Sequence, residues 1–216
     1  TGDVASVSEM LEALLVKSGN EAAIALAEHV AGSEDEFVNL MNDKAKELGL
    51  DNTKYVNSHG LDQDGHVTSA RDLAVLSRYA MNLPEFARVV GAPTSELRTS
   101  GATTTLTNSN YLIGRYEGAT GVKTGWTNDA GYCLVASAER DGIGLVAVIL
   151  GADSEEARFE QAETLLDWGF AHYGLRTLAS ADDTMGLVPV SDYLDVEVTA
   201  LITTDVVAPV FDLEGE

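Results

Sequence analysis

Apolar residues recur every three or four positions through the N-terminal part of the chain, which is the pattern of amphipathic helices. Ser6 and Glu9 have the spacing of a capping box, so the first helix opens there. Gly32 and Gly49 close the second and third helices. The helices predicted in this part cover residues 6–17, 21–32, 33–49 and 69–81.

Two stretches between and after these helices lack the helical pattern. Residues 50–67 are rich in Asn, Asp, Gly and His, which predicts a loop. Residues 82–102 contain Pro84 and Pro93, which predict an irregular stretch.

The pattern becomes that of β-strands from residue 103 onward. A short strand is predicted over residues 103–108. Two β-branched, strongly apolar runs, 131–139 and 143–151, are joined by Arg-Asp-Gly, which predicts a hairpin in a buried sheet. Residues 155–174 predict a helix that covers this sheet.

The composition changes again near residue 175. Residues 175–216 hold nine acidic residues and one basic residue, Arg176. Short apolar runs between proline and acidic turns predict strands over residues 186–191, 194–202 and 206–214. We therefore predict a first domain over residues 1–174 and the start of a small all-β domain over residues 175–216.

Composition excludes several classes of protein. The 216 residues are 45% hydrophobic, enough for a substantial core, and no apolar run approaches the roughly 20 residues of a membrane span. The net charge of −22 disfavours nucleic acid and anionic membranes as partners, because both attract clustered Lys and Arg. Cys133 is the single cysteine, so no internal disulfide forms. It lies in a predicted buried strand, where a thiol behaves as a small apolar side chain.

Two short polar motifs stand out against the apolar pattern. Lys-Ser-Gly-Asn places Ser18 and Asn20 between two predicted helices, and Gly-Val-Lys-Thr-Gly-Trp-Thr precedes the predicted hairpin. A strand at a sheet edge has unpaired N–H and C=O groups that can hold an extended peptide. Each motif alone is a weak indication of function. The two together predict a site in which Lys123 and Thr124 face a carboxylate or an anionic intermediate.

With these motifs the sequence resembles the serine-type D-alanyl-D-alanine carboxypeptidases, the low-molecular-mass penicillin-binding proteins of peptidase family S11. The resemblance covers roughly residues 5–174 and is carried by residues 18–50, 57–80 and 121–154. It implies an α+β fold, the penicillin-binding or β-lactamase-like transpeptidase domain, in which an antiparallel sheet joins a helical lobe. The acidic tail resembles the start of the family's C-terminal β domain.

The family uses three catalytic motifs, Ser-x-x-Lys, Ser-x-Asn and Lys-Thr-Gly. Ser18 and Asn20 match the second motif, and Lys123 begins the third. The resemblance implies that Ser18 relays a proton to the leaving amine, that Asn20 holds the substrate amide, and that Lys123 tunes the field around Ser18.

The remaining residues of the third motif form the substrate-binding set that the resemblance implies. Thr124 would help to bind the substrate carboxylate, and the N–H of Trp126 would be one oxyanion donor. Gly125 and Thr127 complete the set, Gly125 because it lets two backbones approach closely.

The first motif is absent, because no serine in this chain is followed three residues later by lysine. The resemblance implies that it lies upstream on a central helix, together with two strands of the sheet. We therefore expect an N-terminally incomplete domain that forms no acyl-enzyme alone. The strand Gly142–Gly151 would lack its neighbour, so we expect its apolar edge to pair with the missing N-terminal segment or with a second copy.

The function that the resemblance implies is removal of the terminal D-Ala from peptidoglycan stem peptides through an acyl-enzyme. Such a cell-wall hydrolase acts outside the cytoplasm, needs no cofactor and is inhibited by β-lactams; membrane anchoring of the full-length protein stays open. Two alternatives also stay open. One is a β-lactamase or esterase on the same scaffold, and the other is a non-catalytic peptidoglycan- or partner-binding pseudoenzyme.

Other polar residues are interpreted as structural. His59, Asp62, Asp64 and His66 form a polar cluster without zinc spacing, so we interpret them as a structured loop and expect no metal site. Arg140 lies near the predicted hairpin turn and is interpreted as a solvated charge.

Overall fold

The structure is a computed structural model that describes residues 4–191 and 196–211. The chain divides into two compact units. The first unit contains Thr1–Arg140 and Gly144–Asp167, and the second contains Asp141–Ile143 and Trp168–Glu216. Within the described ranges, no helix is both long and apolar enough to cross a membrane.

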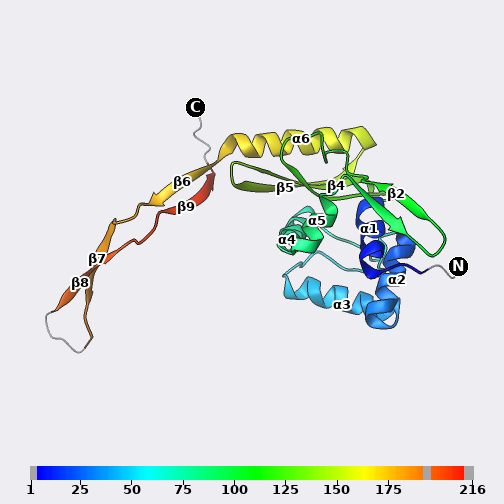
Figure 1. Cartoon of the computed structure of the whole chain (residues 1–216), viewed down its shortest axis with the longest axis horizontal. Helices are drawn as coiled ribbons and strands as arrows, with labels where there is room; N and C mark the ends of the chain where they lie inside the picture. The colour runs from blue at the N-terminus through cyan, green and yellow to red at the C-terminus, as the bar shows by residue number, and fades with distance from the viewer. Residues whose placement is uncertain (1–3, 192–195, 212–216) are drawn as a thin grey trace. The chain divides into compact units, whose positions relative to one another are not determined.

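The N-terminal part of the first unit is helical (Figure 1). Its helices are α1 (Val7–Lys17), α2 (Asn20–Ala31), α3 (Glu34–Glu47), α4 (Ala70–Met81) and α5 (Pro84–Val90). The predicted capping box is confirmed, because Ser6 Oγ accepts from Glu9 N at 3.2 Å and Glu9 Oε2 accepts from Ser6 N at 2.8 Å. Ser33 Oγ accepts from Glu36 N in the same way at 3.2 Å. The four predicted helices exist, and side-chain caps visible in the sequence define where two of them begin.

The expectation of an irregular stretch over residues 82–102 is wrong in two places. α5 begins at Pro84, where the missing proline N–H costs little because the first helical turn has no partner for it. Residues Thr94–Arg98 form β1, which pairs antiparallel with β2 (Thr103–Thr107). A strand depends on its partner, so the residues of β1 considered alone do not reveal it.

The main sheet of the first unit contains β3 (Ala119–Thr127), β4 (Gly131–Arg140) and β5 (Ile143–Ala152), hydrogen-bonded in that order. The predicted hairpin is confirmed, with Asp141 and Gly142 at φ 51° and 77° in its turn, as expected for a tight connection. Because β4 is central, β3 and β5 each have one edge that no strand of the described ranges covers.

Helices cover both faces of this sheet (Figure 1). α6 (Glu155–His172) runs along one face, where Ala162 and Leu166 are fully buried. α1, α4 and α5 lie on the opposite face. This arrangement is the antiparallel sheet with a helical lobe that the sequence predicts.

The second unit contains two antiparallel ribbons. One joins β6 (Tyr173–Ala179) to β9 (Val206–Phe211), and the other joins β7 (Thr184–Pro189) to β8 (Glu197–Leu201). The three predicted strands of this region are confirmed, but residues 194–195 and 212–214 of those predictions lie outside the described residues. β6 is missed by the sequence pattern, which predicts helix up to residue 174. The domain boundary after residue 174 stays a prediction.

Candidate active site

The Lys-Ser-Gly-Asn motif forms the junction between α1 and α2. Ser18 ends α1 in the left-handed region, at φ 64° and ψ 42°, and its N–H donates to Leu14 O at 3.0 Å. Gly19 precedes α2, of which Asn20 is the first residue. A Cβ at residue 19 would lie 3.3 Å from Ala13 O, so this close turn favours glycine. Ser18 is exposed and Asn20 is half-buried, so both remain available at the surface of the helical lobe.

A short segment connects this junction to the Lys-Thr-Gly strand. The N–H of Ser109 donates to Val16 O at 3.1 Å, two residues before Ser18. The side-chain amide of Asn110 donates to Gly121 O at 2.8 Å, two residues before Lys123. Asn110 is 2% exposed, so this link between the end of α1 and β3 is shielded from water.

A buried cluster of valines joins α5 to β3 and β4, close in sequence to the Lys-Thr-Gly motif. Val90, Val122 and Val135 form this cluster, and Leu15 of α1 packs against it. Val135 lies directly opposite Lys123 in the β3–β4 register, and directly opposite residues point to the same face of a sheet. Lys123 therefore shares a sheet face with Val135, a member of this cluster.

Lys123 lies in an environment that disfavours its charge. Burial and the positive charge of Arg158 lower the pKa of Lys123 to about 8. Its Nζ donates to the carbonyl of Thr124 at 2.7 Å. A lysine with this pKa exchanges its proton readily near neutral pH, as a group that influences proton transfer at a neighbouring hydroxyl must.

The residues after Lys123 differ in their exposure. Thr124 is buried, whereas Trp126 is 55% exposed and stands 6.0 Å from the ring of Tyr132. Gly125 is also exposed, on a strand of which one edge pairs with no other strand of the described residues. Thr127 Oγ1 accepts from Ala130 N at 3.0 Å and shapes the turn after β3. Its contact with substrate stays a prediction.

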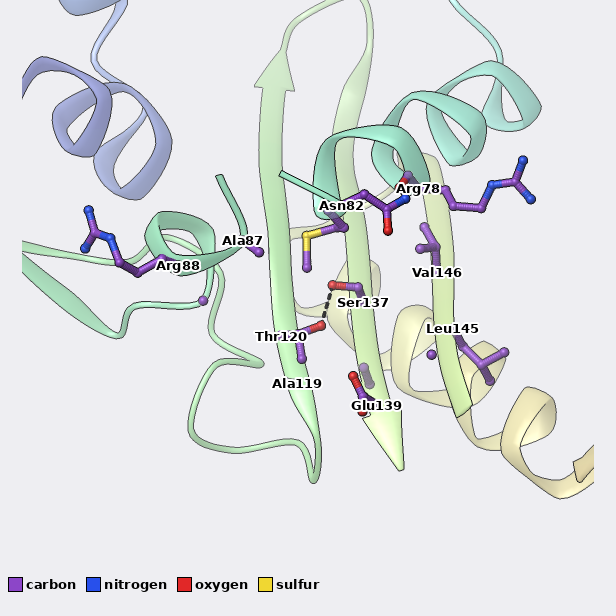
Figure 2. Close-up of a pocket in the computed structure, with 14 residues that line it drawn as sticks. Arg78, Asn82, Ala87, Arg88, Ala119, Thr120, Ser137, Glu139, Leu145 and Val146 are labelled. Carbon is purple, nitrogen blue, oxygen red and sulfur yellow. Dashed lines mark hydrogen bonds between the residues drawn. The ribbon is translucent and has the colours of Figure 1, made fainter. Parts of the chain in front are cut away.

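A groove of about 650 Å³ separates α4 and α5 from the same face of the sheet (Figure 2). Its floor contains Thr120 and Ser137, whose hydroxyl groups share a hydrogen bond of 2.8 Å. Arg78 and Asn82 line it from α4, and Val146 lines it from β5. The helical lobe and the sheet therefore leave space between them close to the start of β3.

The model of the D-alanyl-D-alanine carboxypeptidases, peptidase family S11, matches residues 1–154. The chain belongs to this family. D-alanyl-D-alanine carboxypeptidase DacF of Bacillus subtilis (strain 168) is 40% identical over 190 residues, which are 88% of this chain and 49% of that protein. The chain thus spans about half the length of the curated relatives it matches.

Solved structures confirm the predicted fold of this family member. A peptidoglycan synthesis regulatory factor (PBP3) from Streptococcus pneumoniae has a TM-score of 0.82 at 31% identity, over 95% of this chain and 63% of that one. Penicillin-binding protein D2 from Listeria monocytogenes, in its ampicillin-bound form, has a TM-score of 0.70 at 36% identity, over 77% and 68% of the two chains.

The loop over residues 50–67 of this S11 chain is held by hydrogen bonds to α3 and to the turn after β3. Ser58 donates to Glu34 Oε1 at 2.6 Å, and His66 Nδ1 accepts from Val56 N at 3.3 Å. Asp62 Oδ2 accepts from Asp129 N at 3.4 Å, so the loop reaches the turn after β3. In the part of the chain that the structure describes, no three His, Cys, Asp or Glu side chains gather to hold a metal ion.

Arg158 is the residue of this site that the sequence analysis misses. Its Nη1 donates to Gly125 O, the glycine of Lys-Thr-Gly, at 3.1 Å. Arg140, interpreted from the sequence as a solvated charge, donates to Glu117 O at 3.1 Å and pairs with Asp167 at 3.5 Å. The one signal in the sequence is that Arg158 interrupts a helical segment otherwise rich in glutamate, which is too weak to single it out.

Proposed function

We propose that this chain is the part of a serine-type D-alanyl-D-alanine carboxypeptidase that supplies two of its three catalytic motifs. The observation that carries the proposal is that residues 109–110 link the two motifs in a chain that belongs to family S11: Ser109 N donates to Val16 O, two residues before Ser18, and Asn110 donates to Gly121 O, two residues before Lys123. The substrate is the D-Ala-D-Ala end of a peptidoglycan stem peptide, and the product is the shortened peptide plus free D-Ala.

The reaction needs a serine hydroxyl from a Ser-x-x-Lys motif, which this sequence does not contain. That oxygen attacks the carbonyl carbon between the two D-alanines and forms an ester, while its proton passes through Ser18 to the leaving nitrogen. The C–N bond breaks and D-Ala leaves as an amine. Water then hydrolyses the ester and restores the serine. Lys123 holds positive charge near Ser18 and so favours this proton relay.

The free edge of β3 receives the peptide as an additional strand. Thr124 faces the terminal carboxylate of the substrate, and Asn20 holds its amide from the opposite wall. The N–H of Trp126 points a hydrogen bond at the oxyanion that forms during attack; removing one such donor lowers the rate by about 10²–10³-fold in other enzymes. The lack of a side chain at Gly125 allows the two backbones to approach closely.

The segment that carries the nucleophile packs, in this proposal, in the groove between α4, α5 and the sheet, and pairs with the strand Gly142–Gly151. The groove is lined by small residues such as Gly91 and Ala138, which leave room for a helix to approach the sheet. When that segment is absent, a second copy of the chain covers the same strand edge.

The substrate class places the protein outside the cytoplasmic membrane, at the cell wall. β-Lactams act as inhibitors because they acylate the same nucleophile as the substrate does. The ampicillin-bound structure of the Listeria relative supports this part of the proposal.

A peptidase assay tests the proposal. The chain is extended with the coding sequence that precedes it and incubated with a stem pentapeptide, and D-Ala release is followed by mass spectrometry. We expect one D-Ala per peptide from the extended chain, a loss of at least about 10²-fold in rate with Ser18→Ala, and no release by the 216-residue chain.

The same assay separates the alternatives. Rapid hydrolysis of penicillin without D-Ala release would indicate a β-lactamase on the same scaffold. Binding of the pentapeptide without release, by a chain whose preceding coding sequence contains no Ser-x-x-Lys, would indicate the pseudoenzyme.

A further inference from the structure

Arg158 is almost completely buried between α6 and the Lys-Thr-Gly strand. Its side chain is 5% exposed, Nη1 donates to Gly125 O at 3.1 Å, and Nη2 donates to Glu155 Oε1 at 2.7 Å. The guanidinium carbon lies 4.9 Å from the ring centre of Phe159 and 5.5 Å from that of Tyr132. One guanidinium thus connects the first turn of α6 to the backbone of β3.

Burying this charged side chain costs free energy, and packing alone does not explain why a charged residue occupies the position. Nε of Arg158 is buried and has no hydrogen-bond partner within the described residues, and the side chain of Glu155 is itself 44% exposed. Replacing buried charges by apolar side chains of similar volume is often neutral or stabilising. A charged residue at this position therefore points to a role for its contact with Gly125.

That contact adds to the pairing of β3 with β4 in holding the peptide plane that follows Gly125. A peptide unit is planar, so the Gly125 carbonyl and the Trp126 N–H are fixed relative to each other and point in opposite directions. Gly125 pairs with Cys133 in the β3–β4 register, and an added Cβ at residue 125 would meet only Cys133 Cβ, at an ordinary 3.8 Å. A hydrogen bond that holds the carbonyl thereby also aims the N–H.

We infer that Arg158 is a positioning residue: by holding Gly125 O it orients the Trp126 N–H toward the oxyanion. This inference rests on the proposed function, which gives the Trp126 N–H its role. Arg158 does not contact the reacting atoms. Its positive charge acts in addition on Lys123, where it adds to the effect of burial in lowering the pKa to about 8.

The first test uses the 216-residue chain and nuclear magnetic resonance, so it needs no activity. In Arg158→Met we expect hydrogen exchange at the Trp126 amide to quicken by about 10-fold or more, because the peptide plane is released. The Lys123 titration midpoint should rise from about 8, yet stay below the ordinary lysine value, since burial remains. Arg158→Lys keeps a charge but loses the two-pronged hydrogen bonding, so its Trp126 amide should also exchange faster while the Lys123 midpoint moves less.

Arg140 provides a matched control. It too contacts a backbone carbonyl, Glu117 O at 3.1 Å, a carboxylate, Asp167, at 3.5 Å, and a ring, that of Tyr116, at 4.4 Å. Arg140→Met should leave both the Trp126 exchange rate and the Lys123 midpoint unchanged. Equal effects of Arg140→Met and Arg158→Met on these two readouts would overturn the inference, because they would reflect general loosening of the fold.

The second test uses the chain extended to include the nucleophile. We expect Arg158→Met to slow acylation by fluorescent penicillin by about 10²-fold and to move the basic limb of its pH profile to higher pH. If the parent forms no adduct, the proposed function fails, while the resonance measurements still decide the role of Arg158. If the parent is acylated and Arg158→Met is acylated equally fast with the same pH profile, the inference fails.

Discussion

Ser18, a residue of the proposed site, has a left-handed backbone conformation that serine rarely adopts. A serine in the left-handed region costs about 1–2 kcal/mol relative to helical backbone, and such residues persist where the surroundings determine them. Here the N–H of Ser18 donates to Leu14 O and the turn continues directly into α2. The strained conformation is what separates the two helices by so few residues and leaves the hydroxyl exposed.

Substitution of this serine by glycine should separate stability from function. Ser18→Gly removes the left-handed strain but adds freedom to the unfolded chain, so the free energy of unfolding should stay constant or rise by up to about 1 kcal/mol. Glu28→Gly, at an exposed position in α2, should lower it by about 1 kcal/mol. Urea denaturation measures both. Equal destabilisation by the two variants would show that Ser18 is not strained.

The depressed pKa of Lys123 predicts a pH-dependent cost to stability. Below pH 8 Lys123 is charged in both the folded and the unfolded chain, so burying its charge opposes folding. Between about pH 8 and 10.5 only the unfolded chain keeps this proton, so the free energy of unfolding rises with pH in this window. Lys123→Met should therefore increase the free energy of unfolding by roughly 1–3 kcal/mol at pH 7, with an advantage that fades toward pH 10.

A control for this effect is Lys46→Met. The Lys46 side chain is 78% exposed and pairs with Asp43 on the surface, so its replacement should change stability by less than about 0.5 kcal/mol at either pH. An advantage of Lys123→Met that persisted undiminished at pH 10 would mean that it came from packing rather than from charge.

At the scale of the elements, the turn that leads into β3 depends on one glycine. Gly118 has φ 77°, its carbonyl accepts from Glu139 N at 2.9 Å, and an added Cβ would collide with Glu139 O. Gly114 has a similar φ of 80°, but an added Cβ there meets no described atom within 4 Å. Both glycines thus have a left-handed backbone, and they differ in whether neighbouring atoms leave room for a Cβ.

Alanine substitutions should reveal this difference in chemical denaturation. Gly114→Ala should lower the free energy of unfolding by about 1–2 kcal/mol, the cost of left-handed backbone alone. Gly118→Ala should cost about 3 kcal/mol or more, because the start of β3 has to move away from β4. Similar costs for the two variants would contradict the packing described between residue 118 and β4.

An element can be predicted from the sequence when the interactions that define it lie within a few residues. α1 and α3 are predictable because Ser6 and Ser33 cap them through bonds that span three residues. β1 and β6 are not, because each exists only by pairing with β2 or β9. The site divides in the same way: Ser18 and Lys123 belong to short motifs, whereas Arg158 reaches Gly125 from a distant helix, which no window of sequence shows.

At the scale of the whole molecule, the edge of β5 that pairs with no strand of the described residues should govern association. Leu150 of β5 is 41% exposed at this edge, and a lysine there should prevent pairing with another strand. We expect the 216-residue chain to self-associate in analytical ultracentrifugation and Leu150→Lys to sediment as a monomer. The net charge of −22 opposes self-association, so about 0.5 M NaCl should strengthen it by screening.

Leu165 supplies the comparison for this prediction. It is 42% exposed on α6, away from the strand edge, so Leu165→Lys should associate as the parent does. A parent chain that sediments as a monomer at all concentrations, or a Leu165→Lys variant that dissociates as completely as Leu150→Lys, would argue against pairing through β5.

Covalent labelling with fluorescent penicillin tests most directly whether Ser18 and Lys123 form opposite walls of one catalytic groove. We expect no adduct on the 216-residue chain, a serine-linked adduct on the chain extended through Ser-x-x-Lys, and labelling at least about 10²-fold slower when either Ser18→Ala or Lys123→Ala is introduced into the extended chain. Labelling of the 216-residue chain itself, or undiminished labelling of both variants, would contradict this expectation.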